Sequence, residues 1–269
     1  SMAKLSLSAG IKYASTKITN SPLDEFINSQ AISITQELGE LKGSLMKAGQ
    51  MLSMYGEHFL PPEAIRVLKT LQSDSPSIEW SVMREHLENY LDADLIDELE
   101  INPESIGSAS LGQVHLATIK STQEKIALKI QYPDVDKAID SDIAALKKIL
   151  SLTKIIPSGI DLTNVFEEIK FMLKQELDYN LEAQQTIRYK DLIGDDARYV
   201  VPQVFTKYSN AKVLATEYIE GLRSDHNLVQ SLAEPRRNKI AENFLELYFN
   251  EIFNWNFVQT DPHLGNYKI

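Results

Sequence analysis

Cysteine is absent from the 269-residue sequence, which excludes disulfides, thiolate catalysis and cysteine-ligated zinc. Long hydrophobic runs are also absent, because no stretch approaches the roughly 18 apolar residues of a membrane span. Basic residues are scarce: 27 lysines and arginines face 38 acidic residues, for a formal net charge of -11. Since binding to a phosphate backbone requires clustered basic side chains, we expect no nucleic-acid partner.

The composition that is present is that of an ordinary globular protein, with 43% hydrophobic and 24% charged residues. The length suits one large domain or two lobes separated by a cleft. We expect no secretion signal in the first residues, and the lack of cysteine is compatible with a reducing compartment. We therefore expect a cytoplasmic location, with any membrane contact peripheral.

Changes in hydrophobic periodicity divide the chain. Helical periodicity extends from about 21 to 100, and strand alternation follows from about 106 to 132, with strands at 113–117 and 125–130 around a polar turn at 121–124. Helices are expected again between 134 and 189, strands at 198–205 and 213–219, and a last helix at about 235–255. The sequence therefore predicts an α+β fold after an all-helical N-terminal extension.

A glycine- and serine-rich segment precedes the first of these strands. It reads Gly107-Ser108-Ala109-Ser110-Leu111-Gly112-Gln113-Val114 and fits the nucleotide-binding loop G-x-G-x-x-G-x-V, except that Ala109 replaces the middle glycine. Glycines in such a loop let backbone N–H groups approach phosphates closely. Since the Cβ of Ala109 occupies part of that space, the phosphates are expected to lie differently here. The same letters also fit a simple turn before a strand.

Lys129 lies on the following strand. Alternation puts Ile126, Leu128 and Ile130 on one face and Ala127 and Lys129 on the other. The lysine thus shares its face with a small residue that leaves room for a planar base, and the segment is similar to the V-A-I-K strand of protein kinases. A lone strand lysine normally extends into solvent, but the adjacent loop favours a phosphate-binding role.

A kinase lysine needs a carboxylate partner, and Glu176, Asp178 and Glu182 follow in the next helical region. Treated as one helix, that region has an apolar stripe made of Ile169, Leu173, Leu177 and Leu181. Glu176 lies at one edge of the stripe, and Asp178 and Glu182 share the opposite side. We assign Glu182 as the partner of Lys129, with a solvated acidic face as the alternative.

The segment Asp261-Pro262-His263-Leu264-Gly265-Asn266 has the D-x-x-x-x-N spacing of a kinase catalytic loop. Phosphoryl transfer requires an oxygen near the acceptor hydroxyl and a ligand for Mg²⁺. Asp261 is the candidate base and Asn266 the candidate metal ligand. The His-Arg that normally precedes the aspartate is replaced by Gln259-Thr260, and Asp-Pro and Gly-Asn are also ordinary turn formers.

Two stripes mark the helix near the N-terminus. One contains Leu38, Leu41, Leu45 and Leu52, and the other contains Glu40, Gly43, Lys47 and Gln50. A helix with two organised faces is expected to lie between other elements, and its glycines, which cost about 1 kcal/mol each in helix propensity, indicate close packing. Its segment Lys47-Ala48-Gly49-Gln50 has no general chemical interpretation.

Taken together, these motifs resemble the UbiB family, also called the ABC1 or AarF-domain kinases. The marks of that family are K-x-G-Q in a helical extension, an alanine-bearing nucleotide loop, an E-x-D helix and a D-P-H-x-G-N loop. Each occurs here in the family's order, as Lys47 to Gln50, Ser108 to Val114, Glu176 to Asp178 and Asp261 to Asn266. Leu264 departs from the proline that is usual at its position.

The resemblance implies a protein-kinase-like fold with a small antiparallel sheet in the N-lobe. Residues 1–100 would form the helical extension with the K-x-G-Q motif, residues 101–220 the N-lobe with inserted helices, and residues 221–269 the start of a helical, truncated C-lobe. The extension would cover the cleft where an ordinary kinase binds its protein substrate.

The same resemblance implies ATP and Mg²⁺ as cofactors. The nucleotide would contact Lys129, backbone groups near Glu217 to Ile219, which would hold adenine, and the loop residues Gly107, Ser108, Ala109, Ser110, Gly112, Gln113 and Val114, together with Ala127. Lys47 would meet Glu176 and Asp178, and Gln50 would lie near the phosphates.

In function, the resemblance implies an ATP-dependent phosphotransferase or ATPase linked to ubiquinone or isoprenoid-lipid metabolism, with a small lipid or quinone-precursor ligand and peripheral contact with the inner membrane. The sequence reaches Ile269 without the Asp-Phe-Gly motif whose aspartate binds the principal Mg²⁺, so activity of this stretch by itself is in question. The alternatives are a non-catalytic pseudokinase-like module that binds nucleotide, lipid or a protein partner, and an unrelated α+β protein with accidental motifs.

Overall fold

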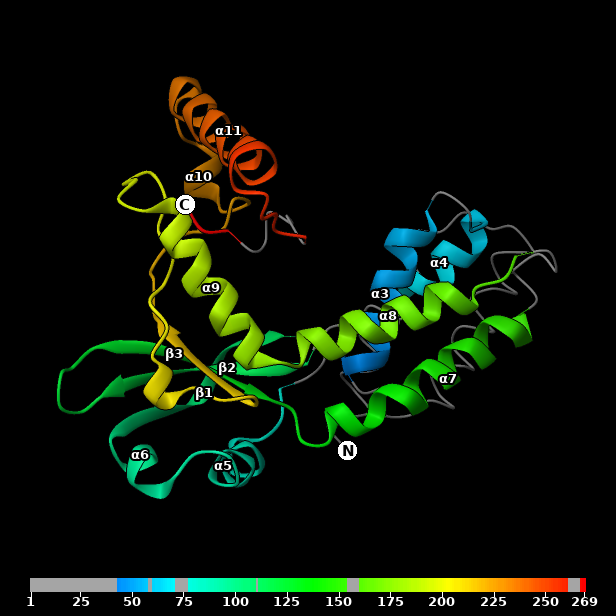
Figure 1. Ribbon diagram of the computed structural model, residues 1–269, viewed down its shortest axis with the longest axis horizontal. Helices are drawn as coiled ribbons and strands as arrows, with labels where there is room; N and C mark the ends of the chain where they lie inside the picture. Colours follow the sequence, from blue (N-terminus) through cyan, green and yellow to red (C-terminus); the bar gives the residue numbers. More distant parts are fainter. Residues whose placement is uncertain (1–42, 58–59, 71–76, 110, 154–159, 261–266) are drawn as a thin grey trace. The chain divides into compact units, whose positions relative to one another are not determined.

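The computed structural model describes the chain except for residues 1–42, 58–59, 71–76, 110, 154–159 and 261–266 (Figure 1). The predictions for Leu38, Glu40 and Leu41, and for the segment from Asp261 to Asn266, lie outside the described residues. Two compact units are present, and each draws on separate stretches of the chain. The predicted division into 1–100, 101–220 and 221–269 stays a prediction.

The first unit comprises residues 1–79, 108–113 and 131–177 and is helical where it is described, apart from the turn between two strands. Its helices are α3 (Gly43–Gly56), α4 (Pro62–Thr70), α7 (Val135–Thr153) and α8 (Thr163–Glu176). Helix α3 packs against the other three, as its two organised faces predicted. The core side chains, each no more than 1% exposed, are Leu45, Leu52, Leu68, Ile139, Leu146, Ile169 and Leu173.

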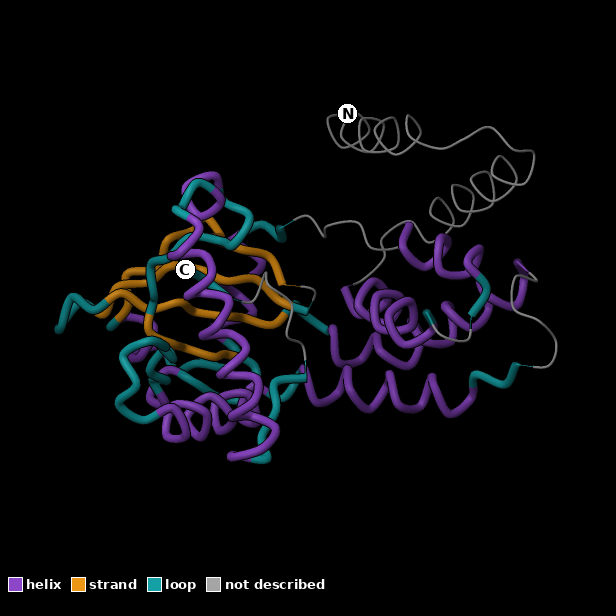
Figure 2. The backbone as a smooth tube through the Cα atoms, turned by 90° about the horizontal axis from the view of Figure 1, so that it is seen from above, coloured by secondary structure: helices purple, strands orange, loops and turns teal. Residues whose placement is uncertain are grey.

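The second unit comprises residues 80–107, 114–130 and 178–269. It contains most of a four-stranded sheet in the order β1 (Leu99–Ala109), β2 (Gly112–Ile119), β3 (Lys125–Gln131) and β4 (Val213–Glu217). Strands β3 and β4 are antiparallel, with Lys129 opposite Leu214 and Ala127 opposite Thr216. Figure 2 shows the strands side by side, viewed from the face of the sheet on which helix α9 (Tyr179–Ile193) lies.

Helices cover both faces of this sheet (Figure 1). Helix α9 (Tyr179–Ile193) lies on one side, while α5 (Trp80–Glu88) and α6 (Ala93–Asp97) lie on the other. The remaining helices are η2 (Thr206–Tyr208), α10 (Asn227–Gln230), α11 (Glu234–Phe249) and the π-helix η3 (Asn250–Trp255). Among the described helices, none combines the length and the apolar composition that crossing a bilayer requires.

Alternation on β3 places its side chains as predicted. Ile126, Leu128 and Ile130 are each 0% exposed, whereas Ala127 and Lys129 on the other face are half-buried. The polar turn before β3 is closed by a hydrogen bond from the Ile119 N–H to the Glu124 carbonyl at 2.9 Å. The face with Lys129 is the one that α9 covers, because cross-strand partners share a face and Leu214 packs on α9.

Three predicted elements differ from the structure. The strand expected at 198–205 is wrong, since only Val204 forms an isolated bridge, to Thr216. The helical prediction up to residue 100 is wrong at its end, where β1 begins at Leu99. The single helix expected through 169–182 is two helices, because the carboxylate of Asp178 accepts hydrogen bonds from the backbone of Asn180 and Leu181 and starts α9 as its N-cap.

Lowering the pH from about 7 to about 5.5 is expected to destabilise the second unit through His115 of β2. The imidazole is fully buried, packs on Trp80 and donates from Nδ1 to the Asn102 carbonyl at 2.8 Å, and burial lowers its pKa below the ordinary value. The unfolded chain therefore takes up a proton that the folded chain refuses. Stability is complete above about pH 6.5 and falls with pH, by at most about 1.4 kcal/mol per pH unit.

Urea unfolding at a series of pH values measures this effect. The His115→Gln variant is the control, because an amide does not titrate; it is expected to be less stable throughout but to show a smaller loss between about pH 7 and 5.5. Equal slopes for the two proteins would contradict the assignment to His115.

Candidate functional site

Lys129 of β3 and Glu182 of α9 form an ion pair in the second unit. The Lys129 ammonium nitrogen lies 2.8 Å from Oε1 and 2.7 Å from Oε2 of Glu182, so both carboxylate oxygens accept hydrogen bonds from it. The two side chains are 24% and 39% exposed, which leaves them accessible to a ligand. Such a paired ammonium is held ready to bind phosphate oxygens.

Tyr179 completes the surroundings of this ion pair. Its side chain is 0% exposed, and the Lys129 ammonium lies 4.6 Å from the centre of its ring, within the range of a cation–π interaction. Tyr179 is also the first residue of α9, directly after the capping Asp178. The start of this helix thus fixes Tyr179 and, one turn later, Glu182, so the backbone itself orients both contacts to Lys129.

The glycine-rich segment is divided between the two units: residues 108–113 belong to the first, and Gly107 and Val114 belong to the second. Gly107 is in β1 and is exposed, and a Cβ added there would meet no atom within 4 Å. Packing among the described residues therefore does not require glycine here, and the close approach of a phosphate stays a prediction. Ala109 ends β1, and Gly112 and Val114 belong to β2, while Ser110 lies outside the described residues.

In the first unit, the amide of Gln113 is bonded to the chain ahead of α5. Its Oε1 accepts from the Ile78 N–H at 3.0 Å and its Nε2 donates to the Ile78 carbonyl at 3.2 Å. The side chain is 1% exposed. Ser108 and Leu111 are also in this unit, and the Leu111 carbonyl accepts from the Tyr132 N–H at 3.1 Å. The Gln113 side chain thus fixes the turn, and the prediction that Gln113 also contacts nucleotide stays a prediction.

The helical extension contributes a second ion pair, also within the first unit. The Lys47 ammonium of α3 lies 3.2 Å from Oε1 of Glu176, the last residue of α8, and the two side chains are 15% and 31% exposed. The prediction that Lys47 meets Glu176 thus agrees with the geometry. Gln50 lies on the same helix and is exposed. Asp178, the other predicted acid, belongs to the second unit, where its Oδ1 caps α9.

The end of β4 leads into the segment that was predicted to hold adenine. The Glu217 N–H donates to the Gln203 carbonyl at 2.7 Å, and the Glu217 carboxylate accepts from the Gln203 N–H at 3.2 Å. Next along the chain, the Ile219 carbonyl accepts from the Lys268 ammonium at 3.1 Å. A base bound here would meet this carbonyl, so Lys268 is a neighbour that the sequence did not indicate.

The Lys129 ammonium fits phosphate oxygens, because it is a charged donor held in place by its carboxylate partner Glu182. Among the residues that the structure describes, no group of three or more histidines and carboxylates is arranged to hold a metal ion. The predicted metal ligand Asn266 and the predicted base Asp261 lie outside the described ranges, so their roles stay predictions.

The family model described as the ABC1 atypical kinase-like domain matches residues 70–269. The Danio rerio "Atypical kinase COQ8B, mitochondrial" is 32% identical, over 93% of this chain and 39% of its own length. The Saccharomyces cerevisiae "Atypical kinase COQ8, mitochondrial" is 30% identical, over 87% of this chain and 46% of its own length. The chain thus spans less than half the length of these two relatives.

A solved structure is similar as well. A Mycobacterium tuberculosis protein determined in complex with erythromycin is 30% identical and has a TM-score of 0.60, covering 92% of this chain and 62% of that chain. Together with the four-stranded sheet and its helices, these matches confirm the predicted protein-kinase-like α+β fold.

Proposed function

Because the chain belongs to the ABC1 atypical kinase-like family, we propose that it carries the nucleotide-binding residues of a UbiB-type ATP-dependent phosphotransferase or ATPase. The observation that supports this most strongly is the ammonium of Lys129, bound by both oxygens of Glu182 at 2.8 and 2.7 Å on a strand that follows a glycine-rich turn. That combination is the phosphate-binding arrangement of protein kinases.

Each residue has a role in the proposal. Lys129 binds the α- and β-phosphates, and Glu182 keeps its ammonium in place with help from the Tyr179 ring. Backbone N–H groups of the segment from Gly107 to Val114 bind phosphate oxygens, and backbone groups of Glu217 and Ile219 bind adenine. Asp261 accepts the proton of the attacking hydroxyl or positions a water molecule, and Asn266 binds Mg²⁺, which neutralises charge on the phosphates when bound.

The helical extension contributes residues to the proposal by analogy with the family. Lys47 and Glu176 join α3 to α8 in the first unit. By resemblance to the family, Gln50 is proposed to lie near the phosphates and Asp178 to be a further partner of Lys47. A small lipid or quinone-precursor ligand and peripheral contact with a membrane are part of the proposal, by analogy with the family. The two relatives named above are mitochondrial by name. By analogy, we propose that the intact protein acts at the surface of an inner membrane.

Titration of the chain with ATP in a calorimeter, with and without Mg²⁺, tests the proposal together with an assay for released phosphate. We expect saturable ATP binding that strengthens when Mg²⁺ is added, because the metal offsets the charge of the phosphates. Magnesium-dependent binding without phosphate release would favour the non-catalytic pseudokinase-like module. Absence of ATP binding at millimolar concentrations would contradict both.

A further inference from the structure

Glu251 is a buried acid for which the proposed reaction has no role. Its side chain is only 2% exposed and lies in the π-helix η3. Tyr189 of α9 donates its hydroxyl proton to Oε1 of Glu251 at 2.5 Å. Burial, followed by this hydrogen bond, raises the pKa of Tyr189 far above its ordinary value, so the phenol remains a donor. A buried carboxylate is costly without such a partner, so the contact determines where this part of the chain can lie.

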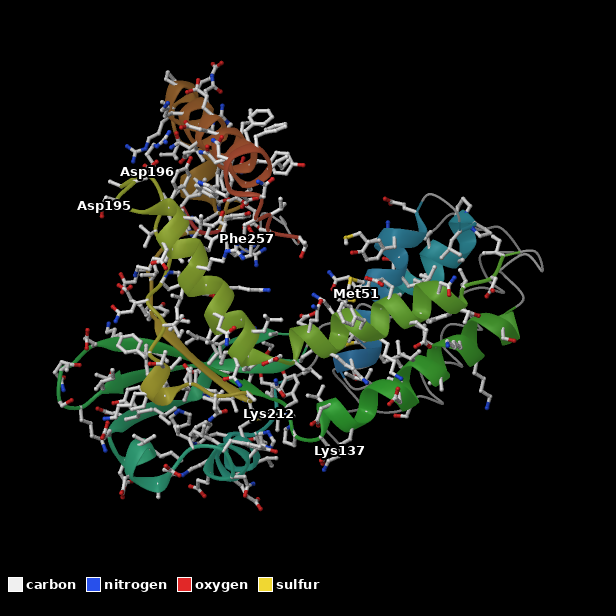
Figure 3. All side chains as sticks on the ribbon, in the orientation of Figure 1. Met51, Lys137, Asp195, Asp196, Lys212 and Phe257 are labelled. Carbon is white, nitrogen blue, oxygen red and sulfur yellow. The ribbon has the colours of Figure 1, made fainter. Side chains whose placement is uncertain are left out.

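Aromatic side chains pack against the ring of Tyr189. The Tyr189 ring meets Trp255 edge-on at 5.9 Å and lies 6.3 Å from the Phe257 ring, and the guanidinium of Arg188 lies 4.3 Å from the Phe257 ring centre. Figure 3 shows Phe257 beside α9. Two consecutive residues of α9 therefore contact the π-helix or the residues that follow it.

A backbone hydrogen bond also joins the two ends of the segment from Glu251 to Phe257. The Phe257 N–H donates to the Glu251 carbonyl at 3.0 Å, and Asn256 adopts a left-handed conformation with φ 47. A π-helix disrupts the regular hydrogen-bond ladder and is often found at functional sites. Side-chain contacts must stabilise such a segment, and the contact of Glu251 with Tyr189 does so.

This contact joins two parts of the proposed site. Tyr189 follows Glu182 by seven residues on α9, which places both on one face of the helix, two turns apart. At one end of that face Glu182 binds Lys129, and at the other Tyr189 binds Glu251. Phe257 precedes the predicted base Asp261 by only four residues in the sequence.

We propose that Tyr189 and Glu251 are positioning residues that couple the Lys129–Glu182 ion pair, through α9, to the π-helix η3 and the described residues 256–260 that follow it. The inference rests on the proposed function, because it assigns the coupling to nucleotide binding at Lys129. When a phosphate binds Lys129, any shift of Glu182 moves α9. The hydrogen bond from Tyr189 to Glu251 then transmits that shift to η3 and the residues after it. Breaking the hydrogen bond uncouples the two ends while leaving each in place.

Tryptophan fluorescence tests the coupling without requiring turnover. The sequence has two tryptophans, so Trp80→Phe leaves Trp255, next to Tyr189, as the only one. We expect Mg²⁺-ATP to change the Trp255 emission in this background, and Tyr189→Phe to abolish most of the change while nucleotide affinity stays within about threefold. Phenylalanine keeps the ring against Trp255 and removes only the hydroxyl. Phosphate release is expected to fall about tenfold to a hundredfold, because α9 no longer holds Glu251, whose helix precedes the proposed base Asp261 in the sequence.

Tyr199→Phe is the matched control. Its hydroxyl donates to the Asn243 carbonyl of α11 at 2.7 Å, so the variant makes the same chemical change but loses a hydrogen bond to α11 instead of the one to η3. It is expected to keep the Trp255 response. Equal loss of the response in both variants would overturn the proposal, since the effect would then be a general loss of packing.

A double variant separates positioning from stability. Tyr189→Phe with Glu251→Leu removes both polar partners, so the melting temperature is expected to recover, whereas the Trp255 response and phosphate release stay low. Recovery of all three would show a purely structural role and overturn the inference. If the parent protein binds Mg²⁺-ATP but Tyr189→Phe leaves the response unchanged, only this inference fails; if the parent binds no nucleotide, the proposed function fails and the inference with it.

Discussion

Replacing Lys129 with alanine is expected to weaken Mg²⁺-ATP binding by about tenfold to a hundredfold. The Lys129 ammonium is already bound to both carboxylate oxygens of Glu182 and lies over the Tyr179 ring, so it needs little rearrangement to donate to phosphates. Hydrogen bonds to charged groups contribute about 1.5 to 3 kcal/mol each, and alanine provides none. Isothermal titration calorimetry of the wild type and Lys129→Ala measures the difference directly.

Lys125→Ala is the matched control for this prediction. Lys125 begins the same strand, is exposed and loses the same charge when it is replaced. It is expected to bind ATP like the wild type. Lys129→Ala should unfold within about 1 kcal/mol of the wild type, because Glu182 is exposed enough to be hydrated once its partner is gone. Equal ATP affinity of wild type and Lys129→Ala would contradict the assigned role.

Asp261→Asn is expected to reduce phosphate release by about 10² to 10⁴-fold while ATP affinity remains nearly unchanged. An amide is almost the same size as a carboxylate, but it cannot accept the proton of the attacking hydroxyl. The two measurements therefore separate: calorimetry reports binding through Lys129, and the phosphate assay reports the chemical step. The prediction applies to any form of the protein in which phosphate release is detected.

The control for Asp261→Asn is Asp195→Asn in the exposed loop after α9, where the same chemical change affects no residue of the proposed site. Its phosphate release should equal that of the wild type. Undiminished release by Asp261→Asn would mean that another group accepts the proton, and Asp261 would lose its proposed role.

The sequence predicted local features of the site well because they depend on short-range periodicity. Alternation along β3 is enough to place Lys129 and Ala127 on one face, since Ile126, Leu128 and Ile130 each require burial. The order of the motifs indicated the family and thus the kinase-like fold, which matches confirm over residues 70–269. No knowledge of long-range contacts was needed for either conclusion.

Two predictions of secondary structure failed because hydrophobic periodicity was given more weight than individual residues. One such residue is a proline, which lacks a backbone N–H, and the others form side-chain hydrogen bonds. The expected strand at 198–205 includes Pro202, which has no N–H to donate, and Val200, which is 69% exposed. The Arg198 guanidinium also binds Asp196 and Glu246 outside any ladder. At Asp178 a signal was present, because aspartate is a favoured N-cap, but the continuous apolar stripe on either side of it concealed the break.

Contacts between distant residues that belong to no recognised motif could not be predicted from the sequence. Tyr179 looked like part of an acidic helix, and only the fold places its ring beneath Lys129. Glu251 belongs to no motif in the sequence, and its partner Tyr189 is 62 residues away. Such pairs have no local spacing that a sequence could reveal.

The N-cap at Asp178 changes what the spacing of the acidic motif means. Glu176 and Asp178 are two residues apart in the sequence, a spacing that suggests two ligands of one cation. In the folded chain, however, Glu176 ends one helix and bonds to an amine, while Asp178 begins the next helix by accepting from backbone N–H groups. The two-residue spacing therefore separates the last residue of α8 from the N-cap of α9, the helix that bears Glu182.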